Sequence, residues 1–76
     1  MRPIKTKIFI VKCQAKKEDT TVDFDCMYVL AKKKVDAMAK TLHYWEEKHY
    51  KDLVIEGYDF SVTECNEVTS NINILV

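Results

Sequence analysis

The chain has very few of the residues that interrupt regular structure or staple small folds. Its 76 residues include one glycine and one proline, which argues against disorder and against a loop-rich scaffold. Its three cysteines, Cys13, Cys26 and Cys65, are an odd number without close spacing, whereas small secreted domains use even sets. We therefore expect a single small domain over residues 1–76, with reduced thiols and a cytoplasmic location.

The sequence also lacks the patterns that direct a chain to a membrane. No charged, apolar and small-residue series typical of a signal peptide opens it. No apolar run approaches the roughly 20 residues that a membrane-spanning helix needs. We expect no membrane partner.

Motifs for catalysis and metal binding are missing as well. The sequence contains no glycine-rich phosphate loop, no nucleophile elbow and no His-Glu-x-x-His. His43 and His49 lie six residues apart, about 120° around a helix, so they cannot both ligate one metal from that helix. The cysteines lack the close spacing of zinc sites. We expect no catalytic residue, no metal site, no cofactor and no enzymatic activity.

Charge is balanced over the whole chain but not along it. Twelve basic and twelve acidic residues give no net charge, which excludes a strongly basic nucleic-acid-binding protein. Residues 1–40 carry ten Lys and Arg against five Asp and Glu, whereas residues 41–76 carry two against seven. The two halves either pair within the fold or present two poles to a partner.

The first apolar run predicts a central strand over residues 4–14. It is apolar on both parities, with Ile4, Ile8 and Ile10 on one and Phe9, Val11 and Cys13 on the other. Such a run is typical of a strand that is covered on both sides. A polar connection over residues 15–21 has the length of a hairpin and leads to a second strand, Val22–Leu30.

The register of this hairpin decides which residues share a face. Pairing Cys13 with Cys26, and Val11 with Tyr28, would gather most of the large apolar side chains on one side of the sheet. That side would carry Phe9, Val11, Phe24, Tyr28 and Leu30.

A helix is predicted over about residues 31–50, followed by a third strand, Leu53–Glu64. The helix has one apolar stripe with three-four spacing, formed by Ala31, Val35, Met38, Leu42, Trp45 and His49. In the third strand Tyr58, Phe60 and Val62 point inward, and Gly57 marks a bulge or a short turn.

These elements predict an α+β fold with the order β-β-α-β. Because the first strand is central, we expect a three-stranded antiparallel sheet in the order 2-1-3, with the helix on one face. Residues 69–76 would form a tail or an extra edge strand, since 72–76 are apolar enough for a fourth strand.

One helix can cover only one face of such a sheet. Ile8, Ile10, Met27 and Val29 would then form an aliphatic patch on the other face, and patches of this kind usually mark an interface. Either the apolar residues of 72–76 cover it, or a second copy does so in a two-fold dimer. Tyr44, at the acidic end of the helix, is a further predicted contact for a protein.

Lysines gather at the expected start of the helix. Lys32, Lys33 and Lys34 lie there in sequence, and the start of the first strand would add Arg2 and Lys5. A helix N-terminus ringed by lysines can bind a phosphate backbone or an acidic protein surface. The alternative is a solvated basic end, partly neutralised by acids of the third strand. Against nucleic acid, the aromatic residues of the sheet are predicted to face the core and not a base-stacking surface.

In its size and order of elements the chain resembles the small accessory and inhibitor proteins that bacteriophages and mobile elements encode. The resemblance implies a protein in the host cytoplasm that acts by binding another protein. We therefore expect a non-enzymatic, homodimeric protein-binding module that occludes or modulates a protein partner. The alternative is an accessory nucleic-acid-binding protein that uses Arg2, Lys5 and the three lysines 32–34.

Overall fold

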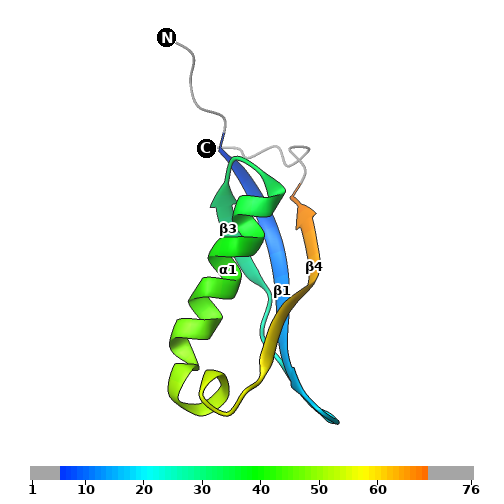
Figure 1. Ribbon diagram of the computed structural model, residues 1–76. Helices are drawn as coiled ribbons and strands as arrows, with labels where there is room; N and C mark the ends of the chain where they lie inside the picture. The colour runs from blue at the N-terminus through cyan, green and yellow to red at the C-terminus, as the bar shows by residue number, and fades with distance from the viewer. Residues whose placement is uncertain (1–5, 69–76) are drawn as a thin grey trace.

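The computed structural model describes residues 6–68, in which an antiparallel sheet carries one long helix across one of its faces (Figure 1). The elements in chain order are β1 (Lys7–Lys17), β2 (Thr20–Asp23), β3 (Met27–Ala31), α1 (Lys34–Lys48), the π-helical turn η1 (Tyr50–Val54) and β4 (Asp59–Glu67). The predicted α+β fold is confirmed. The predicted C-terminal strand or tail lies outside the described residues.

β1 is the central strand and has antiparallel partners on both of its edges. Phe9 pairs with residues of both β3 and β4, and Gln14 pairs with residues of both β2 and β4. A strand has only two edges, so β2 and β3 must lie one after the other along the same edge, with β4 along the other. The predicted order 2-1-3 is thus confirmed, with the predicted second strand divided into two pieces.

The division of the second strand inserts one extra residue into its pairing with β1. Gln14 pairs with Asp23 in β2, and Val11 pairs with Met27 in β3. A separation of three residues on β1, from Val11 to Gln14, therefore corresponds to a separation of four residues on the paired segment, from Asp23 to Met27. The extra residue is accommodated at positions 24–26, which are not part of either strand. A one-residue offset moves every later side chain to the other face of the sheet.

The predicted hairpin register is therefore wrong in both pieces. Relative to the predicted pairing of Cys13 with Cys26, β2 is offset by two residues, which keeps its side chains on the predicted faces, and β3 is offset by one, which reverses them. Met27 and Val29 face α1 and pack against the core, whereas Tyr28 and Leu30 face away from it and are exposed. Cys26 does not pair with Cys13. It is exposed, and the Cys13 carbonyl instead accepts a hydrogen bond from the backbone N–H of Phe24, at 3.1 Å.

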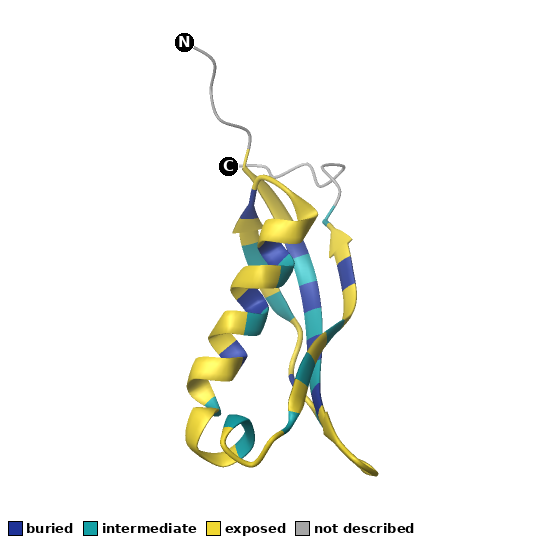
Figure 2. Cartoon of the chain, viewed as in Figure 1, coloured by how far each residue is buried: buried dark blue, intermediate teal, exposed yellow. Residues whose placement is uncertain are grey.

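The core lies between α1 and the sheet (Figure 2). Phe24 stacks on Trp45 with ring centroids 4.5 Å apart, and the rings of His49 and Phe60 also stack on Phe24, at 5.1 and 5.7 Å. The buried apolar residues are Phe9, Val11, Cys13, Ala15, Phe24, Ala31, Ala37, Trp45 and Cys65. Thr41, the buried polar residue among those described, donates its hydroxyl to the Ala37 carbonyl at 2.7 Å, so its burial leaves no unpaired hydroxyl.

The helix is shorter than predicted at both ends. It begins at Lys34 because Lys33 is extended and because Ala31 completes β3. Val35, predicted to belong to the apolar stripe, is exposed. At the other end the chain continues through η1, where a hydrogen bond from His49 Nδ1 to Asp52 Oδ2, at 3.1 Å, holds the pKa of the Asp52 carboxyl below its ordinary value.

Because η1 occupies residues 50–54, the predicted start of the third strand at Leu53 is also wrong. Gly57 lies in the turn before β4 with a φ of 88°, a left-handed conformation that glycine adopts without strain. The predicted short turn at this glycine is therefore observed, and β4 follows it from Asp59.

The three cysteines differ in accessibility. Cys13 and Cys65 are buried, whereas Cys26 is exposed. Burial, with a smaller effect from Cys65, raises the pKa of the Cys13 thiol to about 11. We expect iodoacetamide at neutral pH to alkylate Cys26 in the folded protein, and to reach Cys13 and Cys65 only after denaturation. Mass spectrometry of digests checks this, and rapid labelling of Cys13 in native protein would contradict the burial seen here.

Candidate functional site

The sheet face that points away from α1 is called the open face here. It carries an apolar group, the open-face patch, formed by Ile8, Ile10, Tyr28 and Leu30. Ile8 pairs with Leu30 and Ile10 with Tyr28, so the four side chains are direct cross-strand neighbours. Tyr28 is 70% exposed, Leu30 61% and Ile8 44%, while Ile10 is half-buried between its neighbours.

Polar and charged side chains border the open-face patch. On the β4 side, Asn66 lies opposite Ile10, and Glu64 lies opposite Lys12. Farther along β1, Lys16 pairs with Asp59. The open face therefore combines an apolar centre with two cross-strand pairs of opposite charge between β1 and β4. An apolar patch with a polar border is the usual form of a protein-binding surface.

The structure brings together only part of the predicted interface. Ile8 and Ile10 lie on the open face, as the pattern of β1 indicates. Met27 and Val29 do not, because the extra residue before β3 turns them toward α1. Tyr28 and Leu30 take their places. Sequence reasoning missed these two because β3 is apolar on both parities, and only the offset at residues 24–26 separates the two choices.

Tyr44 is not part of the open-face patch. It lies on α1, on the opposite side of the sheet, and is 43% exposed. Its ring meets Trp45 edge-on with centroids 5.0 Å apart, and Lys48 Nζ lies 5.7 Å from the Tyr44 centroid. The structure thus places Tyr44 on a separate surface.

Only part of the predicted basic site belongs to the residues that the structure describes. Arg2 and Lys5 lie outside the described residues. Lys33 immediately precedes the first residue of α1, Lys34, and has no side-chain capping hydrogen bond. Acids from two elements lie at the same end of the sheet, Asp36 in the first turn of α1 and Glu67 on β4.

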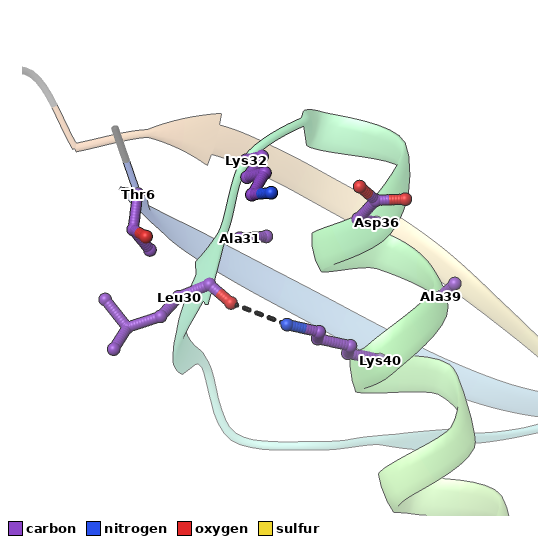
Figure 3. A pocket seen from close by; sticks show the side chains of 7 residues that line it. All are labelled: Thr6, Leu30, Ala31, Lys32, Asp36, Ala39 and Lys40. Atoms are coloured by element: carbon purple, nitrogen blue, oxygen red, sulfur yellow. Dashed lines mark hydrogen bonds between the residues drawn. The ribbon is translucent and has the colours of Figure 1, made fainter. Parts of the chain in front are cut away.

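A groove lies between β3 and the start of α1 (Figure 3). Its volume is about 540 Å³, and it is lined by Thr6, Leu30, Ala31, Lys32, Asp36, Ala39 and Lys40. The Lys40 side chain reaches across it, and Nζ donates a hydrogen bond to the Leu30 carbonyl at 3.0 Å. The groove therefore adjoins the open-face patch at Leu30.

No family model matches the sequence, and comparison with curated proteins and with solved structures finds no match. Over residues 6–68, no helix is long and apolar enough to cross a membrane. In the same part of the chain, no three His, Cys, Asp or Glu side chains come together as metal ligands. The surfaces described above therefore provide the basis for inferring a function.

Proposed function

We propose that the chain is a non-enzymatic protein-binding module that self-associates through its open face and occludes or modulates a protein partner. The observation that carries the proposal is the open-face patch, in which three of four large apolar side chains are strongly exposed. Burying such side chains from water contributes roughly 1.5–3 kcal/mol each, before the costs of association. The small size and the order of elements, which resemble phage accessory proteins, agree with such a role.

A second copy of the chain is the occupant that the charges favour. Lys12 and Lys16 on β1 lie beside Glu64 and Asp59 on β4 on the open face. In a two-fold arrangement, the two bases of one protomer can face the two acids of its partner. The chain has no net charge, so two copies do not repel one another at long range. A dimer would also enlarge the small apolar core of a 76-residue chain.

Sedimentation should detect this association. We expect a dimer at micromolar concentration for the wild type, and a folded monomer for Ile10→Lys, because a lysine there places an unpaired charge in the interface. Tyr28→Lys should give the same result at a more exposed position, and it covers the case in which Ile10→Lys does not fold. Tyr44→Lys is the matched control for Tyr28→Lys, since Tyr44 is an exposed aromatic on the opposite side of the sheet, and it should stay dimeric.

A wild type that is still monomeric at tens of micromolar would contradict dimerisation, because a dimer with a micromolar dissociation constant would be detected at that concentration. In that case, aggregation after deletion of residues 72–76 would indicate that the C-terminal segment protects the patch instead.

One observation favours nucleic-acid binding as a second candidate. Tyr28, predicted to face the core, is an exposed aromatic on the open face, where a base could stack on it for about 1–3 kcal/mol. Single-stranded DNA or RNA should then bind with a steep salt dependence. Tyr28→Ala should weaken binding, and Glu at positions 32–34 should reduce the salt slope. Absence of binding at low salt would exclude this candidate.

A further inference from the structure

Among residues 6–68, β3 presents a free backbone edge. The Leu30 carbonyl points away from β1, since it accepts its hydrogen bond from Lys40 Nζ on the far side. Ile8, which pairs with Leu30, turns its own carbonyl toward the β4 side and accepts the Val68 N–H at 2.8 Å. Alternate residues of a strand direct their backbone groups to the same edge, so Tyr28 also faces outward. Within residues 6–68, no strand pairs with this edge.

Lys40 protects this edge in the isolated chain. Free strand edges are templates for an added strand, and proteins commonly cover them with lysine side chains. Here Lys40 satisfies the Leu30 carbonyl directly. Lysine is flexible, and its ammonium group binds a carboxylate more strongly than a neutral carbonyl. A ligand that offered both a backbone N–H and a carboxylate could therefore take the carbonyl and pair with Lys40.

The groove beside β3 would receive the side chains of an added strand. Such a strand lies about 4.8 Å beyond β3 and points alternate side chains to the two faces of the sheet. On the α1 side these side chains would enter the groove, where Ala31 and Ala39 leave room. Its volume of about 540 Å³ lies within the range of roughly 300–1,000 Å³ that is usual for binding sites.

The two faces of the edge differ in chemistry. The groove is lined by two bases, Lys32 and Lys40, against one acid, Asp36, and further lysines lie at the start of α1. The other face of the edge borders Tyr28 and Leu30. An added strand would therefore match this edge with acidic side chains on one parity and apolar side chains on the other.

We propose that the β3 edge binds an extended, acidic segment of a partner protein by strand addition. The segment donates a backbone N–H to the Leu30 carbonyl and accepts the outward Leu30 N–H with one of its own carbonyls, and its carboxylates pair with Lys32 and Lys40 in the groove. Its apolar side chains continue the open-face patch. The site uses backbone groups and the groove, so it stands whether or not a second copy covers the open face.

A short, acetylated and amidated peptide that alternates valine with glutamate is the probe. In NMR titration of the Ile10→Lys variant, it should shift the amide signals of Tyr28 and Leu30 and slow their hydrogen exchange. Using this variant separates the test from dimerisation. The same peptide N-methylated on alternate residues, and a peptide with lysine in place of glutamate, should each bind at least about tenfold more weakly.

Two substitutions test the edge from the protein side. Leu30→Pro removes the outward N–H without removing a bond to β1, and Lys40→Glu reverses a groove charge; each should weaken binding at least about tenfold. Lys51→Glu on η1 is the matched charge control and should change nothing. If Leu30→Pro fails to fold, the N-methylated peptide supplies the same comparison. Equal binding of the N-methylated peptide, or no binding by about 1 mM, would overturn the proposal.

Discussion

Replacing Trp45 with alanine is expected to lower the free energy of unfolding by about 3–5 kcal/mol. The side chain is 7% exposed, and it lies where α1 meets the sheet. Its ring stacks on Phe24 at 4.5 Å and 10°, and Tyr44 meets it edge-on. Truncation would leave a cavity in the middle of this aromatic group, and few neighbours could move to fill it.

Urea denaturation followed by circular dichroism measures this loss. Tyr44→Ala is the matched control, since Tyr44 touches the same ring but is 43% exposed, and it should cost about 1 kcal/mol or less. Trp45→Phe should cost clearly less than Trp45→Ala, because it keeps the stacked ring. It also removes the Trp45 Nε1–H, which has no hydrogen-bond partner among the described residues. A loss below about 1 kcal/mol for Trp45→Ala would mean that Trp45 is not a core residue.

The arrangement of strands could be predicted partly from the apolar run of β1. This run is apolar on both parities, which favours a central strand, but β3 shares the pattern and lies at an edge within residues 6–68, so the pattern alone does not decide the order. With one helix of three-four periodicity between the second and third strands, few antiparallel arrangements remain. The buried position of Trp45 was predicted, but the most buried line of α1 runs through Ala37, Thr41 and Trp45 and not through the predicted stripe, which included the exposed Val35.

The candidate site was harder to predict because it depends on a single inserted residue. Over residues 22–30, the alternation of apolar side chains fits a continuous strand as well as it fits a divided one. Packing under α1 decides between the two. Met27 and Val29 lie against the helix. Tyr28 is exposed, so its hydroxyl group stays in water. A buried tyrosine hydroxyl would need a hydrogen-bond partner within the protein. The placement of Tyr28 and Leu30 on the open face therefore could not be predicted without the tertiary structure, whereas that of Ile8 and Ile10 could.

The β3 edge illustrates a second limit. The lysines near the start of α1 are visible in the sequence. Whether a strand has a free edge, however, depends on how all the other strands are arranged. Only the complete pairing of β1 shows that, within residues 6–68, β3 has a free side. The contact from Lys40 to the Leu30 carbonyl joins residues ten positions apart, and it depends on how α1 crosses the sheet.

The observed register predicts that two neighbouring substitutions lower the free energy of unfolding by very different amounts. Val29→Asp should lower the free energy of unfolding by about 3 kcal/mol or more, because it places an unpaired carboxylate between β3 and α1. Leu30→Asp should change it by no more than about 0.5–1 kcal/mol, because Leu30 is mostly exposed on the open face. In the continuous-strand register, Leu30 would face the helix and the two costs would be exchanged.

Urea denaturation of both variants at low protein concentration distinguishes the registers, since dilution removes any contribution from association. Sedimentation at higher concentration then adds a second difference. Leu30→Asp should remain folded but lose the dimer, because Leu30 belongs to the open-face patch. Larger destabilisation by Leu30→Asp than by Val29→Asp in dilute solution would contradict the offset at residues 24–26, and with it the placement of Tyr28 on the open face.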